Sequence, residues 1–190
     1  MEKKLEKIKQ QVIECTKCEL SQTRNNSVAG KGNFKADVIF VGEAPGKNED
    51  LKGEPFIGIA GKKLSIALES AGITREEVYI TNIVKCRPPK NRVPTSIERE
   101  TCQNYLKKEI EIIEPKIICI LGNTAFNSLL DGKEITKFRG KVVSKNNQLY
   151  FYFNFNLFSD FSVIFFSKKK KTLMIKDNFL LKKNVNKKIK

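Results

Sequence analysis

The sequence contains no histidine. This absence excludes a Ser/His/Asp triad, a Cys/His nucleophile pair and any zinc site that needs an imidazole ligand. The chain also lacks the run of about 18 apolar residues that a membrane span requires, and its Lys-rich start has no apolar signal-peptide core. Its five cysteines are an odd number, which does not suit a secreted disulfide framework. We therefore expect a cytoplasmic protein without a membrane partner.

The last quarter of the chain is depleted in several common residues. Residues 144–190 contain no Gly, Pro, Ala, Glu, Arg or Cys, yet they hold eight of the 13 Phe residues. Eleven lysines and two aspartates give this segment a net charge of +9. Because the enriched residues have AT-rich codons, the segment is either a native phosphate-binding tail or an out-of-frame continuation. We predict one domain over 1–143 and an atypical tail over 144–190.

Positive charge is in excess over the whole chain. Lys and Arg total 36 against 21 Asp and Glu, which gives a net charge of +15 over 190 residues. Such an excess favours a polyanionic partner, and nucleic acid is the first candidate. The length fits one ordinary α/β domain.

Apolar periodicity predicts strands that alternate with helices. Such alternation implies a parallel sheet covered on both faces, with ligands bound beyond the carboxyl ends of the strands. A further strand pair within 151–166 is possible on its imperfect alternation. The predicted strands cover 36–41, 78–81 and 116–121, and the predicted helices cover 2–14, 62–71, 95–113 and 122–130.

Four cysteines fall into two groups, Cys15-x-x-Cys18 and the pair Cys86 and Cys102. Four thiolates can close a metal site, and both zinc and an iron–sulfur cluster accept them. The second pair lacks the short zinc-ribbon spacing, which favours a cluster weakly. Unrelated cysteines are the alternative. Cys119 lies inside an apolar strand and is interpreted as a core thiol.

Loops after the first two predicted strands carry polar groups suited to a ligand. Gly42–Gly46 lets the backbone approach a ligand, and it places the carboxylate of Glu43 at the cleft. Glu49 and Phe56 follow in the same loop, and an aromatic face can accept an unstacked base. Asn82 can donate and accept in one plane, as reading a pyrimidine edge requires. A plain turn, loop packing and capping are the alternatives.

A basic loop follows Asn82. Lys85, Arg87, Lys90 and Arg92 alternate with prolines there. Stiff, positively charged backbone of this kind suits phosphate contacts, although a solvated surface loop is the alternative.

Taken together, these motifs resemble the type-4 uracil-DNA glycosylases, the iron–sulfur branch of their superfamily. The resemblance covers roughly residues 1–143, and its motifs occur in the family's order and spacing. They are Gly42-Glu-Ala-Pro-Gly46, Glu49-Asp50, Gly53-Glu-Pro-Phe-Ile-Gly58, Thr81-Asn-Ile-Val-Lys-Cys-Arg-Pro-Pro89, Leu121-Gly122, Phe138-Arg-Gly140 and the four cysteines.

The resemblance implies a three-layer αβα fold with a parallel four-stranded sheet, and removal of uracil from DNA in base excision repair. It also implies a [4Fe-4S] cluster bound by Cys15, Cys18, Cys86 and Cys102. We expect the chain to act as a monomer on uracil-containing DNA.

The same resemblance assigns roles to individual residues. Glu43 and its loop would position the hydrolytic water, and Glu49 would be a supporting carboxylate. Gly42 and Ala44 would line the base site, where Phe56 stacks on uracil and Asn82 reads its edge. The phosphate contacts would come from Lys85, Arg87 and Arg92.

The chain departs from the family after Arg139-Gly140. The family carries a His-Pro-Ser motif after a final strand, whereas this chain has no histidine. We therefore predict weak activity or low stability, a doubtful fourth strand, and an out-of-frame continuation from about residue 148. The rival functions are a non-catalytic iron–sulfur DNA-binding protein, either a degenerate or a truncated relative, and, less well supported, electron transfer.

Overall fold

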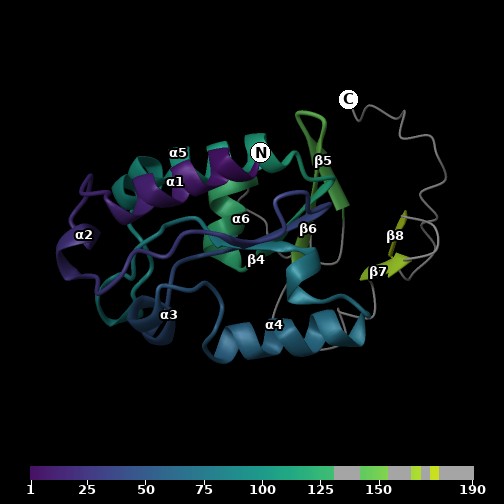
Figure 1. Cartoon of the computed structure of the whole chain (residues 1–190), viewed down its shortest axis with the longest axis horizontal. Helices are drawn as coiled ribbons and strands as arrows, with labels where there is room; N and C mark the ends of the chain where they lie inside the picture. Colours follow the sequence, from purple (N-terminus) through teal and green to yellow (C-terminus); the bar gives the residue numbers. More distant parts are fainter. Residues whose placement is uncertain (131–141, 154–163, 168–171, 176–190) are drawn as a thin grey trace.

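A six-stranded sheet in the order β1-β3-β2-β4-β6-β5 forms the centre of the molecule (Figure 1). The computed structural model describes residues 1–130, 142–153, 164–167 and 172–175. A separate two-stranded sheet pairs β7 with β8. The strands are β1 (Lys31–Gly32), β2 (Val38–Gly42), β3 (Tyr79–Asn82), β4 (Ile117–Leu121), β5 (Val142–Lys145), β6 (Gln148–Phe153), β7 (Ile164–Ser167) and β8 (Thr172–Ile175).

The four inner strands are parallel to one another. β2 pairs in parallel with β3 on one side and with β4 on the other, and β4 pairs in parallel with β6. This arrangement confirms the predicted parallel four-stranded sheet. The two edge strands, β1 and β5, are antiparallel to their neighbours and were not predicted.

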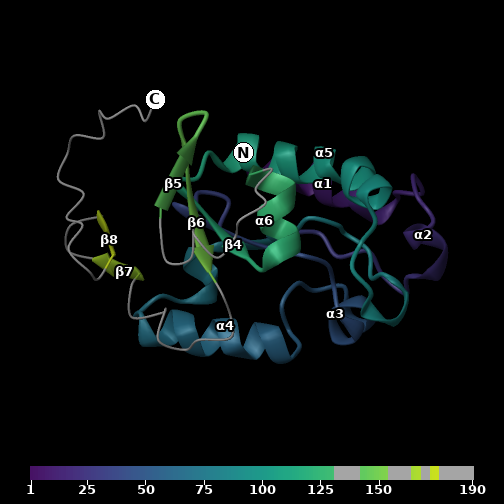
Figure 2. The ribbon, with the colours of Figure 1, turned by 180° about the vertical axis from the view of Figure 1, so that it is seen from behind.

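Helices cover both faces of this sheet (Figures 1 and 2). α1, α5 and α6 lie on one face and α4 lies on the other, which gives the predicted three layers. The helices are α1 (Glu2–Ile13), α2 (Leu20–Thr23), α3 (Lys47–Lys52), α4 (Ile59–Ser70), α5 (Ser96–Ile113) and α6 (Asn123–Leu130), with 3-10 turns at Arg75–Glu77 and Pro89–Asn91.

Alternating side chains of β2 divide the core into two parts. Ile39 and Val41 pack with the residues of α1 and α5, whereas Val38 and Phe40 pack with those of α4. Every residue of β2 is buried, so the strand reads as a continuous apolar run. The strands and helices predicted within residues 1–130 are confirmed to within three residues at each end, whereas the short α2, α3 and β1 were missed.

Local signals explain where the helices begin. Thr95 caps α5: its hydroxyl accepts from the backbone N–H of Glu98, and the Glu98 carboxylate accepts from the N–H of Thr95. Thr74 and Glu77 form the same reciprocal arrangement before β3. Both are capping boxes, in which a Thr-x-x-Glu pattern in the sequence marks the start of a helix.

The fourth parallel strand is present as β6, so the prediction of a doubtful fourth strand is wrong for residues 148–153. β5 and β6 form a hairpin whose turn residues, Asn146 and Asn147, have φ angles of 52° and 63°. Asn tolerates this left-handed conformation, which two-residue hairpin turns require. Phe151 then packs toward α4, whereas Tyr152 packs toward α6.

The prediction that two strands within 151–166 pair with each other is also wrong. β6 pairs with β4 and β5, whereas β7 pairs with β8. The sheet also continues across the proposed domain boundary at residue 143, because β5 spans it. An out-of-frame origin for the segment from about 148 stays a prediction, and most of that segment lies outside the described residues.

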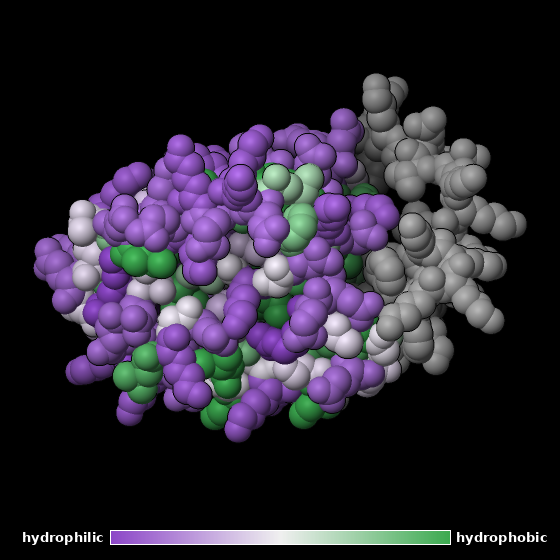
Figure 3. Space-filling model, in the orientation of Figure 1, coloured by the Kyte–Doolittle hydropathy of each residue, from purple (hydrophilic) through white to green (hydrophobic). Residues whose placement is uncertain are grey.

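One face of the molecule is predominantly polar among the described residues. Figure 3 shows hydrophilic residues over most of one face, with apolar residues in small separate groups. Among the described helices, none combines the length and the apolar character needed to cross a membrane.

Replacing Phe151 tests whether β6 completes the core. Phe151→Ala removes a ring that is 1% exposed, so we expect the free energy of unfolding to fall by about 3–5 kcal/mol. Urea denaturation measures this change. Ile66→Ala is the control, because Ile66 is 55% exposed and its loss should change stability by about 0.5 kcal/mol or less. An unchanged urea midpoint for Phe151→Ala would show that residues 148–153 do not pack in the sheet.

Candidate functional site

A pocket of about 550 Å³ opens at the carboxyl ends of β2, β3 and β4. This is the place where parallel α/β sheets bind ligands. The structure brings all six residues that were predicted to act on the base or its bond to this pocket. They are Gly42, Glu43, Ala44, Glu49, Phe56 and Asn82.

Phe56 and Asn82 meet across Gly42. A Cβ atom on Gly42 would lie 2.5 Å from Phe56 Cζ and 2.6 Å from Asn82 Oδ1, so any larger residue would displace both side chains. The backbone of Phe56 has a φ of 54°, which is uncommon for an aromatic residue. Gly61 permits this conformation, because its Cβ would collide with the Phe56 carbonyl at 1.8 Å. The ring is therefore held in place by two close approaches of backbone.

Asn82 carries the most informative polar atom of the pocket. Its side chain is buried, at 2% exposure, and its Oδ1 atom has no hydrogen-bond partner. Buried polar atoms are almost always paired, because an unpaired one costs about 1–3 kcal/mol. An unpaired acceptor that lines a pocket is suited to a ligand that brings a donor.

Two backbone hydrogen bonds fix the position of Asn82 relative to the loop after β2. The N–H of Ile83 donates to the carbonyl of Gly42 at 2.9 Å, and the N–H of Val84 donates to that of Glu43 at 3.2 Å. The residues that follow β2 and β3 at the pocket are therefore hydrogen-bonded directly to each other.

Glu49 organises the loop rather than reaching freely into the pocket. Its carboxylate accepts from the backbone N–H groups of Gly46 (3.1 Å), Ile57 (3.0 Å) and Gly58 (2.7 Å). Its role as a supporting carboxylate in catalysis stays a prediction. Asp50, its neighbour, accepts from the backbone N–H of Asn25 at 2.9 Å and holds the chain after α2.

Glu43 is partly exposed in the pocket, and the hydroxyl of Thr124 donates to its carboxylate. Thr124 lies in the first turn of α6, immediately after β4. A carboxylate that is oriented by one hydroxyl retains free lone pairs for another donor, such as water. Sequence reasoning missed Thr124, because no local pattern links it to a residue 81 positions earlier.

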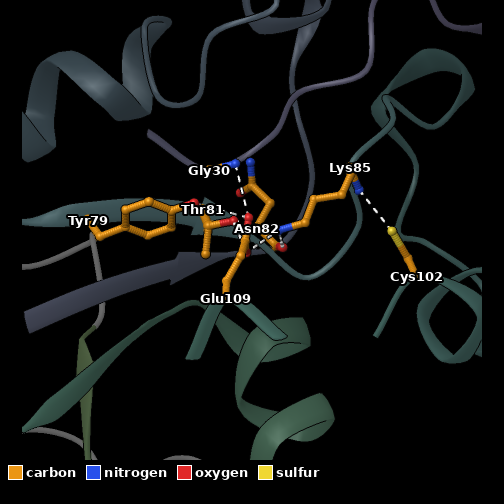
Figure 4. Close-up of polar contacts among 7 residues, drawn as sticks. All are labelled: Gly30, Tyr79, Thr81, Asn82, Lys85, Cys102 and Glu109. Atoms are coloured by element: carbon orange, nitrogen blue, oxygen red, sulfur yellow. Dashed lines mark hydrogen bonds and ion pairs between the residues drawn. The ribbon is translucent and has the colours of Figure 1, made fainter. Parts of the chain in front are cut away.

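The prediction that Lys85 contacts phosphate is wrong. Lys85 is 1% exposed, and its Nζ lies 2.7 Å from Oε2 of Glu109 (Figure 4). Glu109 was also missed, although the sequence carries a signal: it occupies the apolar stripe of α5 with Cys102, Tyr105 and Ile113. A carboxylate on a core-facing stripe indicates a buried cation elsewhere in the chain.

The rest of the basic loop remains at the surface. Arg87 donates from Nε to Oδ1 of Asn91 at 2.7 Å, and Asn91 lines the pocket. Arg92 forms a bidentate ion pair with Glu98, with Nη2 2.6 Å from Oε1 and Nη1 2.8 Å from Oε2. Arg92 lowers the pKa of Glu98 through these bonds, so part of the Arg92 charge is already compensated. Phosphate contacts by Arg87 and Arg92 stay a prediction.

The four predicted metal ligands all lie in or against the same hydrophobic core cluster. Cys15 and Cys18 pack against the core that contains Cys86 and Cys102, and both interact electrostatically with Cys86. Burial raises the pKa of Cys102 to about 12 and also raises that of Cys86, so metal binding there must displace protons. Cys119 is buried within β4, as expected for a core thiol.

The thiols of the second pair, Cys86 and Cys102, accept hydrogen bonds. Among the described residues, no three Cys, His, Asp or Glu side chains are placed to hold one metal ion. Two N–H groups already point at cysteine sulfurs, from Arg24 Nη1 to Cys86 at 3.0 Å and from Lys85 N to Cys102 at 3.2 Å. Such hydrogen bonds are typical around cluster ligands.

Comparison with known proteins gives consistent matches. The family model of the uracil DNA glycosylase superfamily matches residues 29–189. The type-4 uracil-DNA glycosylase of Archaeoglobus fulgidus is 50% identical over 143 residues, which cover 73% of this chain and 72% of that protein. The type-4 enzyme of Thermotoga maritima is 47% identical over 144 residues, which cover 75% of each chain. A type-5 uracil-DNA glycosylase of Pyrobaculum aerophilum is 34% identical over 102 residues, covering 54% of this chain and 44% of that protein.

Glu49 gives a direct test of how the pocket loop is held. Glu49→Ala leaves three backbone N–H groups without their acceptor, so we expect the free energy of unfolding to fall by at least about 1–3 kcal/mol. Thermal and urea denaturation measure this loss. Glu54→Ala is the matched control, because the Glu54 side chain is 48% exposed in its pair with Lys31. Equal stability of the two variants would refute the loop-organising role.

Proposed function

The chain belongs to the uracil-DNA glycosylase superfamily, and from this membership and the pocket we propose that it hydrolyses the bond between uracil and deoxyribose in DNA. The single observation that carries this proposal is the buried, unpaired Oδ1 of Asn82 beside the ring of Phe56. The family membership agrees with the resemblance that the motifs indicated.

Asn82 and Phe56 would recognise a uracil that has left the base stack. Oδ1 would accept from N3–H of uracil, and Nδ2 would donate to O4 in the same plane. Phe56 would provide a stacking surface for the base. Cytosine presents an acceptor at N3 and an amino donor at C4, so the same amide orientation would meet donor with donor and acceptor with acceptor.

Glu43 would act on water. As the bond between C1′ and N1 breaks, the bonding electrons leave with uracil, and water adds its oxygen to C1′. The Glu43 carboxylate, oriented by Thr124, would accept a proton from that water. Negative charge on the departing base spreads to its oxygens, where Nδ2 of Asn82 would stabilise it at O4. The products are an abasic site and the uracil anion, which becomes neutral uracil when it takes up a proton from water, while Glu43 returns its proton to the solvent.

The DNA backbone would be bound beside this pocket. Of the two arginines predicted to contact phosphate, Arg87 is the better placed, because its partner Asn91 lines the pocket and is uncharged. Arg92 would contribute less, since Glu98 compensates its charge. Phosphate contacts of this kind position the duplex without reading its sequence.

We further propose that Cys15, Cys18, Cys86 and Cys102 hold a [4Fe-4S] cluster. Their shared neighbourhood and the N–H groups of Arg24 and Lys85 support this assignment. When bound, such a cluster supplies a structural cross-link and a one-electron redox centre. The four cysteines would then connect the end of α1 to the loop after β3 and to α5.

Two substitutions test recognition of the base. Asn82→Ala removes hydrogen bonds to the uracil edge, and Phe56→Ala removes a stacking surface worth about 1–3 kcal/mol, so each should lower kcat/KM for uracil release by about 10- to 100-fold. Single-turnover assays on uracil-containing DNA measure this change. Asn104→Ala, on the exposed side of α5, is the control and should behave as the unmodified protein does.

Binding to undamaged DNA separates catalysis from a binding function. We expect both pocket variants to keep the affinity of the unmodified protein for undamaged duplex. If the unmodified chain binds DNA but releases no uracil, a non-catalytic DNA-binding protein is the correct interpretation.

Anaerobic purification tests the cluster. We expect brown protein with about four iron and four sulfide ions per chain, and loss of this colour in Cys86→Ala. Cys119→Ala is the matched control and should retain iron, because Cys119 lies within β4, outside the proposed ligand set. One equivalent of zinc without iron or sulfide would reject the cluster.

A further inference from the structure

Lys85 and Glu109 form a buried ion pair in which every polar atom is used (Figure 4). Their side chains are 2% and 1% exposed. The three hydrogens of the Lys85 ammonium are directed to Glu109 Oε2 (2.7 Å), Thr81 Oγ1 (2.5 Å) and the carbonyl of Asn82 (3.0 Å). An ammonium group has three donors, so its hydrogen-bonding capacity is filled.

The carboxylate of Glu109 is equally well satisfied. Oε2 accepts from Thr81 Oγ1 at 2.9 Å as well as from Lys85, and Oε1 accepts from Gly30 N at 3.2 Å and Tyr79 Oη at 3.3 Å. The partners come from β3, from the loop after it, from the segment before β1 and from α5. A buried charge pair joins these four parts of the chain.

Lys85 also touches both functional parts of the molecule. Its ammonium donates to the carbonyl of Asn82, the residue whose amide lines the pocket. Its backbone N–H donates to Sγ of Cys102, and the next residue is Cys86. One residue therefore bonds to the pocket at one end and to a proposed cluster ligand at the other.

We infer that Lys85, held by Glu109, is a positioning residue that fixes Asn82 for base recognition and couples it to the cysteine site. Replacing a buried ion pair by uncharged groups is often neutral or favourable for stability, so stability alone does not explain this pair. A fixed geometry does, because the Asn82 amide must meet the flat edge of a base. The inference rests on the proposed function.

A double variant separates positioning from stability. Lys85→Met leaves the Glu109 charge buried without a cation, so this variant alone could fail to fold. Lys85→Met/Glu109→Gln keeps the volume and removes both charges, but the hydrogen bond from Lys85 to the Asn82 carbonyl is lost. We expect its melting temperature to stay within a few degrees of the unmodified protein, while kcat for uracil release falls by about 10- to 100-fold. Affinity for undamaged DNA should not change.

Two measurements follow the same variant without catalysis. Hydrogen exchange of a peptide that covers residues 80–87 should become about tenfold faster, because the N–H groups of Ile83 and Val84 bond to the pocket loop. Loss of iron to a chelator should also become several-fold faster, because Lys85 carries the N–H that bonds to Cys102.

Lys116→Met/Asp37→Asn is the matched control. It also removes one positive and one negative charge, here from an ion pair in which Lys116 Nζ lies 2.9 Å from Asp37 Oδ2. The two side chains are 65% and 36% exposed. We expect turnover, hydrogen exchange and iron loss to remain those of the unmodified protein.

The outcomes distinguish the inference from the function on which it rests. An unmodified protein that releases no uracil refutes the proposed function, and hydrogen exchange and iron loss then still decide the coupling. The inference would be overturned if Lys85→Met/Glu109→Gln kept the kcat, the hydrogen-exchange rate and the rate of iron loss of the unmodified protein. A loss of turnover that only follows a loss of folded protein would also overturn it.

Discussion

The parallel pairing of β2 with β3 and β4 is the constraint on which the site depends. It brings Gly42, Asn82 and Leu121 to one edge of the sheet, and these residues line one pocket. The side-chain alternation of β2 also sends neighbouring residues into two separate cores. Both faces of the strand are therefore occupied by packing, so only its end is free to present groups to a ligand. Chemistry at the strand end and stability along the strand are thus spatially separated.

Buried polar groups divide into two kinds in this molecule. Lys85 and Glu109 are fully hydrogen-bonded, to each other and to neighbouring groups of β3 and the segment before β1, and they hold the chain around them. The Asn82 carbonyl accepts a hydrogen bond from Lys85, whereas the buried Oδ1 atom of Asn82 has no partner. An unpaired atom beside a fully satisfied network is consistent with a site that is rigid before its ligand arrives. Rigid polar groups recognise a base edge without a further cost of ordering.

The segment after residue 143 shows how a composition argument and a structure can diverge. Its composition suggested a tail with few turn residues, yet Asn146 and Asn147 turn the chain, and Phe151 is buried in the core. Asn tolerates the left-handed conformation better than most residues that carry a Cβ, so absence of Gly and Pro did not prevent a hairpin. The histidine that the family carries is nevertheless absent from the whole sequence.

The sequence by itself determined the alternating strands and helices, the capping residues and the loops that hold Gly42, Phe56 and Asn82, because these depend on local periodicity and local hydrogen bonds. Only the tertiary structure decided the fate of Lys85. In the sequence it is one of four cations in a basic loop, whereas in the fold it meets Glu109, 24 positions away, in the interior. Thr124 and Glu43 meet across a still longer separation. Charge and spacing along a chain do not specify which distant partner a side chain reaches, because that partner is set by how the helices pack on the sheet.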